Sequence, residues 1–337
     1  MTPFTHDTSR AMGTYKRMIV EKTGAPEAMH LVDVPVVSPG LGEVRIRHEA
    51  IGVDFIDTQI RGGLLPATLP TGLGFAGVGI AVEVGPGVDH VNVGERVAYM
   101  YFVAGSYAEE RIVPADRVVV LPDQTMAPDL AAGALFRGLT AWYLATRLRR
   151  TEPGDVVLVH AAAGGVGLIL VQWLAHLGAT VVGTVDSPEK AAVASEYGCH
   201  HVVAIPGGDF AAEVRAVSGG KGAQIVFDCI GSATIEGSLD SAARFGLIVS
   251  FGWPSGDPDV PLMTLRNKGS LFVTRPTVTQ YTADADDLKH GVDALFGLIA
   301  EGALRIRVGH TYALADAAKA HADLSAGRTT GSLVLVP

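Results

Sequence analysis

The chain has 337 residues, of which 48% are apolar and 18% are charged, and its formal net charge at pH 7 is -9. This length exceeds the usual size of one hydrophobic core, so two domains are expected, and the apolar content excludes a disordered chain. An acidic chain without a long run of Lys and Arg is not expected to bind nucleic acid. The two cysteines, Cys199 and Cys229, provide no disulfide framework and are interpreted as inert thiols.

No segment of the sequence resembles a membrane anchor or an export signal. The first fifteen residues are polar and lack the basic start, the apolar stretch and the cleavage site of a signal peptide. The apolar runs are shorter than the roughly 20 residues that a membrane-spanning helix needs, and glycine interrupts nearly all of them. We therefore expect a cytoplasmic protein that does not insert into membranes.

Strand-like segments dominate the first third of the chain. Between Lys16 and Leu121, short β-branched runs such as "RMIV" and "GVGIAVEVG" are separated by glycine and proline, which predicts a compact barrel or sandwich. The pattern changes at Asp129, where apolar residues recur at helical spacing as far as the positive charges that end at Arg150. This helix is expected to bridge two domains.

From Asp155 onwards, strands alternate with helices. Apolar runs from "DVVLVH" to "SLFVTRP" are separated by helical segments, which indicates a doubly wound α/β domain with a parallel sheet covered on both faces. Two further helices are expected over residues 283–299 and 315–325. The strands "LRIRVGHTYAL" and "GSLVLV" do not continue the alternation, so we expect them to return to the first domain and complete it.

A glycine-rich turn joins the first strand of this α/β domain to its first helix. Ala162, Gly164 and Gly167 occupy the three positions of a GxGxxG fingerprint, with Gly165 and Val166 between the last two. The second glycine lets the backbone approach a diphosphate and the third lets the helix pack closely on the strand, while the helix N-terminus supplies free N–H groups. The turn therefore predicts a dinucleotide cofactor.

Asp186 follows the second strand of this domain, at the position where an acid normally binds the adenosine ribose and favours NADH. An alternative role for Asp186 is to cap the next helix, because "DSPEK" is a natural helix start. Lys190, one turn further, either binds a 2′-phosphate or is solvated. The sequence alone leaves these roles open.

Several segments together resemble a known family. "EAIGVDFIDTQIRGG", "VEVGPGVDHVNVGERVAY", "FRGLTAWYL", the glycine turn, "SFGWPSG" and "KGSLFVTRP" are similar to the NADPH:quinone oxidoreductases, the zeta-crystallin-like, zinc-free branch of the medium-chain dehydrogenases. The resemblance implies a GroES-like β-barrel catalytic domain, residues 1–137 and 276–337, and a Rossmann cofactor-binding domain, residues 138–275. It also implies a homodimer that forms through the strand at residues 269–275.

The same resemblance suggests substrate residues. Asp54 and Gln59 stand where the family has an asparagine and a tyrosine beside the nicotinamide, and a polar turn without function is the alternative reading. Arg275 matches an arginine at the cleft entrance, or else forms an interface salt bridge. Thr140, Phe251 and Gly252 correspond to segments beside the nicotinamide, with plain packing as the alternative.

The metal ligands of the zinc-dependent relatives are not found at the expected positions. Asp54 stands at the place of the first catalytic cysteine, and "GLGFAGVG" replaces the segment that usually carries a histidine, so no metal is expected. Without a Lewis acid, the substrate must accept hydride readily by itself, as a quinone or an enone does. His160 is expected to be a structural, hydrogen-bonded histidine.

The sequence thus predicts an NAD(P)H-dependent quinone reductase. Reduction of activated C=C bonds is a second enzymatic possibility, and a non-catalytic, crystallin-like cofactor-binding protein is a third. The resemblance favours NADPH, whereas Asp186 and the loss of family residues around the 2′-phosphate favour NADH. NADPH and NADH therefore both remain as cofactors.

Overall fold

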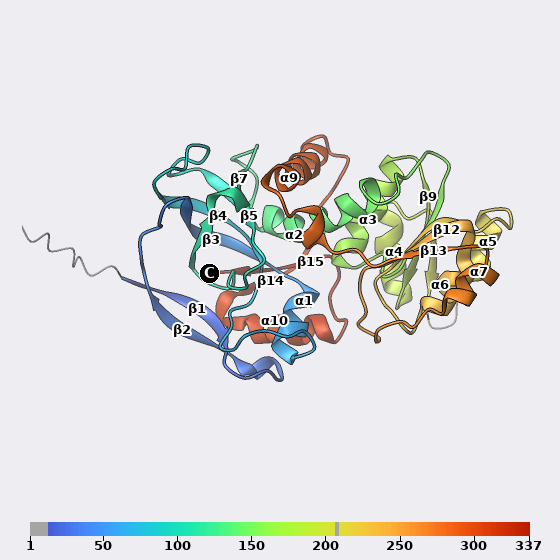
Figure 1. The fold of residues 1–337 in the computed structure, drawn as a ribbon, viewed down its shortest axis with the longest axis horizontal. Helices are drawn as coiled ribbons and strands as arrows, with labels where there is room; N and C mark the ends of the chain where they lie inside the picture. Colours follow the sequence, from blue (N-terminus) through green and yellow to red (C-terminus); the bar gives the residue numbers. More distant parts are fainter. Residues whose placement is uncertain (1–12, 206–208) are drawn as a thin grey trace, which may run out of the picture.

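The computed structural model describes residues 13–205 and 209–337. The chain forms a mostly antiparallel sheet at one end and a parallel sheet at the other, with helices α2 (Pro128–Thr146) and α3 (Gly165–His176) between them (Figure 1). Most of the first fifteen residues, which carry the expectation about a signal peptide, lie outside the described part. Among the helices of the described residues, none has the length and apolar character needed to cross a bilayer.

The first half of the chain, together with two strands from its C-terminal end, forms a curved, seven-stranded sheet. The order along it is β14-β15-β3-β4-β5-β7, and β6 pairs with β3; the C-terminal strands are β14 (Val308–Ala313) and β15 (Ser332–Val336). Long β3 alternates buried and half-buried residues at its start, as expected for a strand with one face on the core. The barrel predicted for this region is thus built from its expected strands, which are β3 (Glu43–Val53), β4 (Ala76–Val84), β5 (Arg96–Met100), β6 (Glu110–Pro114) and β7 (Val118–Val120).

Two elements of this half were not predicted. Strand β2 (Met29–Pro35) pairs antiparallel with β1 (Thr14–Val20). Helix α1 (Phe55–Gly62) follows β3 directly, in the segment for which a polar turn without function was the alternative reading. Its C-cap is Gly63, whose φ of 83° favours a glycine. Asp54 is consequently the residue that precedes a helix, which fixes its backbone.

Helix α2 (Pro128–Thr146) connects the two sheets. It begins with a proline at its first position and ends before "RLRR", so the positive charges lie beyond the helix and do not form its last turn. Nearly all its residues from Ala131 to Ala145 are buried, because it contacts β3, β4 and α3. The predicted bridging helix is confirmed.

The second half forms the predicted parallel sheet. The strand order is β10-β9-β8-β11-β12-β13, and every pair is parallel. The order moves outward in both directions from β8, so the first crossover lies at the centre of the sheet. The strands are β8 (Val156–Val159), β9 (Thr180–Val185), β10 (His201–Ala204), β11 (Ala223–Asp228), β12 (Ala242–Ser250) and β13 (Phe272–Thr274), and the helices are α3 (Gly165–His176), α4 (Pro188–Glu196), α5 (Phe210–Val217), α6 (Ile235–Ser241) and α7 (Leu262–Asn267).

The C-terminal segment returns to the first sheet, as predicted. β15 (Ser332–Val336) pairs antiparallel with β3 and parallel with β14 (Val308–Ala313). In Figure 1 the red strands lie among the blue and teal ones, and red α10 (Ala317–Ser325) packs against blue α1. Between the sheets, α8 (Val278–Tyr281) and α9 (Ala285–Ala300) pack on α2.

Candidate cofactor and substrate site

The glycine turn joins β8 to α3 through an unusual backbone. Ala161 adopts a φ of 50°, which a residue with a side chain rarely does, and Gly164 is the N-cap of α3. No side chain caps this helix, so its first N–H groups remain free for an anion, and the helix dipole adds partial positive charge there. The turn therefore has the local structure that binds a diphosphate.

Close packing explains why two positions of the turn are occupied by glycine. A Cβ on Gly167 would lie 2.9 Å from the Cα and carbonyl carbon of Ala162, and closer still to the Ala161 carbonyl oxygen. A Cβ on Gly165 would lie 2.6 Å from Cδ of Arg137. Real Cβ atoms do not approach so closely, so a side chain at Gly167 would displace the turn backbone, whereas one at Gly165 would displace the side chain of Arg137. These residues, with buried Ala162 and half-buried Val166, fit the predicted dinucleotide fingerprint.

The C-terminal segment covers the edge of this turn. Gly331 forms a parallel bridge with Gly164, and its N–H donates to the Ala163 carbonyl at 3.3 Å. Gly331 has a φ of 70°, which suits a glycine. The link between the end of the chain and the phosphate loop joins the two sheets beside the expected cofactor.

Asp186 lies at the end of β9 and is mostly exposed. It does not cap α4, because the N-cap is Ser187, whose Oγ accepts from the Lys190 N–H. The capping alternative is therefore wrong. Asp186 instead pairs with Lys190, whose Nζ lies 2.7 Å from Oδ2 and also donates to the Gly327 carbonyl at 3.0 Å. The two residues of opposite charge expected near the ribose thus neutralise each other.

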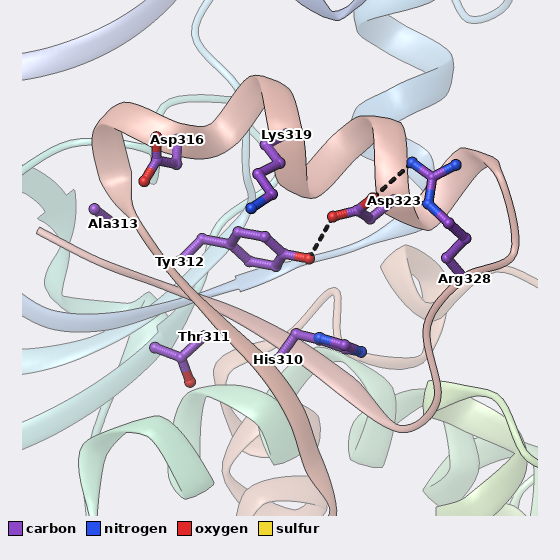
Figure 2. Close-up of a pocket in the computed structure, with 8 residues that line it drawn as sticks. All are labelled: His310, Thr311, Tyr312, Ala313, Asp316, Lys319, Asp323 and Arg328. Atoms are coloured by element: carbon purple, nitrogen blue, oxygen red, sulfur yellow. Dashed lines mark hydrogen bonds and ion pairs between the residues drawn. The ribbon is translucent and has the colours of Figure 1, made fainter.

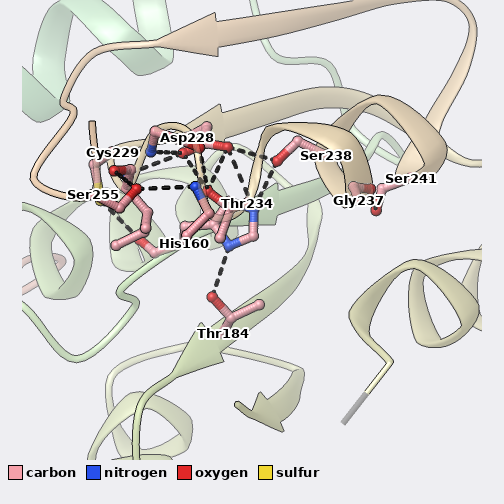
Figure 3. Close-up of polar contacts among 12 residues, drawn as sticks. His160, Thr184, Asp228, Cys229, Thr234, Gly237, Ser238, Ser241 and Ser255 are labelled. Atoms are coloured by element: carbon pink, nitrogen blue, oxygen red, sulfur yellow. Dashed lines mark hydrogen bonds and ion pairs between the residues drawn. The ribbon is translucent and has the colours of Figure 1, made fainter. Parts of the chain in front are cut away.

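A buried polar network supports the carboxyl ends of the central strands (Figure 3). The Asp228 carboxylate accepts hydrogen bonds from Thr234 and Ser238 and from two backbone N–H groups of the loop that follows β11. Ser238 donates to Asp228, so its Oγ accepts from Nε2 of His160 at 2.9 Å, and the other ring nitrogen accepts from Thr184 at 2.8 Å. Burial lowers the pKa of His160, which keeps it neutral. The predicted structural role of His160 is confirmed.

Phe251 and Gly252 follow β12 at the same edge of the sheet. The Phe251 N–H donates to the Asp228 carbonyl at 2.9 Å, and a Cβ on Gly252 would lie 2.7 Å from the Cys229 carbonyl oxygen. Cys229 is half-buried, and burial raises the pKa of its thiol to about 12. Cys199 is buried with its pKa also raised to about 12, so both thiols are protonated and unreactive at neutral pH.

Asp54 and Gln59 belong to one structural unit. Asp54 immediately precedes α1, Gln59 lies one turn into it, and both are nearly buried. The Asp57 carboxylate accepts the Asp54 N–H at 2.9 Å, which fixes the start of the helix. Burial raises the pKa of the Asp54 carboxyl, although the neighbouring Arg137 opposes this change.

Arg137 connects the barrel to the phosphate loop, and the sequence did not identify it. Its Nη2 lies 3.3 Å from Oδ1 of Asp54 and donates to the Val53 carbonyl, while its stem lies against Gly165. An arginine within an otherwise apolar helix was a signal that could have revealed this residue. Through Arg137, the predicted substrate residue Asp54 is therefore connected to Gly165 of the predicted cofactor site.

Two other predicted residues make contacts of their own. Arg275 pairs with Asp257 and stacks over the Trp253 ring at 4.0 Å, at the exposed edge beyond β13. Within the described residues, no hydrogen bond or ion pair joins it to Asp54 or Gln59. Thr140 is buried in α2, and its hydroxyl donates to the Phe136 carbonyl at 2.9 Å, so that hydroxyl is already used within the helix.

A second buried polar group adjoins Asp54 and was also missed. Tyr107 donates to Asp57 at 2.9 Å and accepts from Nε2 of His321 at 3.0 Å. Burial and the neighbouring Asp54 raise the pKa of Asp57 to about 7, and burial lowers that of His321 to about 3. These contacts join α1, which carries Gln59, to α10. No pattern local in the sequence reveals them, because the residues come from distant segments.

One open pocket of about 480 Å³ lies away from Asp54, between β14 and α10 (Figure 2). There Asp323 accepts from Tyr312 at 2.8 Å and pairs with Arg328 at 2.6 Å. Arg328 neighbours Gly327, so the pocket adjoins the segment that contacts Lys190. Across residues 13–205 and 209–337, no three His, Cys, Asp or Glu side chains gather as metal ligands.

Comparison with known proteins agrees with this architecture. Residues 40–123 match the family described as "Alcohol dehydrogenase GroES-like domain", and residues 165–293 match that described as "Zinc-binding dehydrogenase". The predicted fold, a GroES-like barrel with a doubly wound Rossmann domain, is confirmed.

Individual relatives extend over nearly the whole chain. A quinone oxidoreductase from Pseudomonas aeruginosa is 43% identical over 324 residues, covering 96% of this chain and 99% of that protein. A 2-haloacrylate reductase from a Burkholderia species is 41% identical, with 95% and 98% covered. The solved structure of Escherichia coli quinone oxidoreductase complexed with NADPH has a TM-score of 0.92 and 39% identity, with 96% and 100% covered. The chain belongs to the quinone oxidoreductase family of the medium-chain dehydrogenases/reductases.

Proposed function

We propose that the protein is an NAD(P)H-dependent quinone reductase that uses no metal. The observation that carries this proposal is the series of contacts from Gly165 of the phosphate loop through Arg137 to Asp54, because a dinucleotide bound at that loop would lie beside a nearly buried polar site. The relatives named quinone oxidoreductase support the same activity. The carboxylate of Asp54 stands where the zinc-dependent relatives hold a thiolate ligand, which supports chemistry without zinc.

The residues present fit a nicotinamide dinucleotide. The free N–H groups at the start of α3, from Gly165 to Gly167, would bind its diphosphate. Asp186 and Lys190 would lie at the ribose, and Thr140, Phe251 and Gly252 would lie towards the nicotinamide. When bound, the cofactor supplies a hydride to the substrate. The chain's own contribution is to orient the two rings and to keep the polar site beside Asp54 and Gln59 nearly dry, which strengthens hydrogen bonds to an oxygen that gains charge.

Either NADPH or NADH fits the ribose end. A lone Asp186 would repel a 2′-phosphate, but Lys190 at 2.7 Å compensates its charge. The relative solved with NADPH supports the phosphorylated cofactor. The ratio of the two dissociation constants, measured by the quenching of protein fluorescence, determines the preference.

The division of the chain follows from the same proposal. Residues 1–137 and 276–337 would form the catalytic domain, and residues 138–275 the cofactor domain. A homodimer is supported by the edge strand β13, because Phe272 is 60% exposed there and an apolar open edge favours pairing with a second strand. Sedimentation velocity of the wild type and of Phe272→Lys tests this assembly, and an unchanged monomer in both would contradict it.

A second candidate is reduction of an activated C=C bond. It is favoured by the 41% identity to a 2-haloacrylate reductase over nearly the full chain. Oxidation of NADPH and NADH with a panel of quinones, 2-haloacrylate and alkenals separates the two functions. Turnover on quinones at a higher kcat/KM than on alkenes supports the first, and the reverse order supports the second.

A further inference from the structure

Arg137 is an unusual residue in its helix. It is 4% exposed in the middle of α2, and its guanidinium reaches out of the helix to the end of β3. One nitrogen, Nη2, contacts both the Val53 carbonyl and the Asp54 carboxylate. The other terminal nitrogen, Nη1, is buried and has no hydrogen-bond partner among the described residues. A buried N–H group without a partner is costly, so it needs an explanation.

The stem of Arg137 lies against the first residue of α3. A Cβ on Gly165 would lie 2.6 Å from Cδ of Arg137, so the arginine occupies the space that a side chain at that position would need. Gly165 is also at the uncapped N-terminus of α3, where the N–H groups are free. A fixed positive charge and a free helix end therefore adjoin each other, and both favour an anion.

Asp54 opposes this attraction. Its carboxylate lies 3.3 Å from Nη2, so it compensates most of the charge that Arg137 would otherwise present to the helix end. Both side chains are nearly buried, at 5% and 10% exposure, so water screens the pair weakly. The strength of the positive field at the phosphate loop therefore depends on Asp54, a residue of the substrate side.

We propose that Arg137 is a positioning residue that couples the two halves of the site: its charge strengthens cofactor binding at the phosphate loop, and Asp54 tunes that charge from the substrate side. This inference rests on the proposed function for the identity of the anion, which is the cofactor diphosphate. It assigns a role to a residue that no local motif identifies. It also predicts that opposite changes at the two partners have opposite effects on cofactor affinity.

The experiment measures the dissociation constant of NADPH for four proteins by fluorescence quenching, without any quinone. Arg137→Met keeps the stem and removes the charge, so the uncompensated Asp54 repels the diphosphate and the dissociation constant rises about tenfold. Asp54→Asn leaves Arg137 uncompensated, so the constant falls severalfold. The double variant returns to within about threefold of the wild type, because neither charge remains.

Arg149→Met is the matched control. Arg149 pairs with the nearly buried Asp155 at 2.8 Å, but this pair lies before β8, at the opposite end of the strand from the phosphate loop. Loss of this pair lowers the melting temperature and leaves the NADPH dissociation constant unchanged. Arg137→Lys keeps the charge and should retain an affinity for NADPH within about threefold of the wild type. If Arg137→Met does not fold, this variant is measured in its place.

Three results would overturn the proposal. They are an unchanged affinity in Arg137→Met, a loss of affinity in Asp54→Asn as large as that in Arg137→Met, or a loss of affinity in Arg149→Met equal to that in Arg137→Met. The last two would show that the ion pair only supports the fold. Failure of the proposed function is seen separately, as a wild type that binds NADPH with no turnover on quinones.

Discussion

Replacing Gly164 by alanine separates the binding role of the phosphate loop from its packing role. Gly164 has φ and ψ of -78° and 176°, which alanine adopts readily, and its new Cβ would lie 3.1 Å from the Ala161 carbonyl oxygen. A shift of a few tenths of an ångström relieves that contact. Alanine in a compatible conformation also restricts the unfolded chain, by about 0.4–1 kcal/mol. The free energy of unfolding should therefore stay the same or rise slightly.

Cofactor affinity should respond in the opposite way. The backbone at Gly164 must approach the diphosphate closely, and a methyl group holds the phosphate oxygens away from the free N–H groups of α3. We expect the NADPH dissociation constant to rise at least tenfold, which corresponds to about 1.4 kcal/mol. Gly167→Ala provides the contrast, because its Cβ would overlap backbone atoms of Ala162 at 2.9 Å. That variant should lose about 1–3 kcal/mol of stability.

Urea unfolding and fluorescence titration with NADPH measure the two effects on the same samples. The expected pattern is a stable Gly164→Ala protein with weak binding and a destabilised Gly167→Ala protein. If Gly164→Ala binds NADPH as tightly as the wild type, the diphosphate does not lie at this turn and the reasoning is refuted.

Three further predictions concern charge and ionisation. Asp186→Ser frees Lys190 and should shift the preference, measured as the ratio of the NADPH and NADH dissociation constants, towards NADPH. Lys190→Met should shift it towards NADH. Equal ratios in the wild type and both variants would contradict the ion-pair argument. The Cys229 thiol, whose pKa burial raises to about 12, should react much more slowly with a disulfide reagent at pH 8 in the native protein than in urea, and equal rates would be inconsistent with this. Burial and Asp54 raise the pKa of Asp57 from 3.8 to about 7. Between these pH values the native state holds a proton that the unfolded chain has lost. The free energy of unfolding of the wild type should therefore fall as the pH rises through this range. Asp57→Asn should remove that part of the pH dependence, as urea unfolding at several pH values would show.

The fold was predictable because its signals are local. Each strand of the parallel sheet is a short apolar run, each helix between them has its own periodicity, and the phosphate loop is one continuous segment from Ala162 to Gly167. The return of the C-terminal strands was predictable because they break the alternation. Helix α1 was missed because "FIDTQIRG" is short and its start depends on the reciprocal contact between Asp54 and Asp57.

The site was less predictable, because its contacts join distant parts of the chain. Asp54 was identified by resemblance, but its partner Arg137 comes from another element and no spacing rule connects them. The same holds for the contact between Tyr107 and His321. Asp186 looked like a helix cap, yet the neighbouring Ser187 takes that position, so propensity alone could not decide between adjacent cap residues.

The central claim is that a cofactor held by the phosphate loop delivers hydride to a quinone beside Asp54. The most direct measurement is the oxidation of NADPH deuterated at C4 in the presence of a small quinone, followed by absorbance in single turnovers. The account predicts one hydroquinone for each cofactor oxidised and a slower rate for the deuterated than for the undeuterated cofactor. Tight binding of the cofactor with no quinone-dependent oxidation would contradict it.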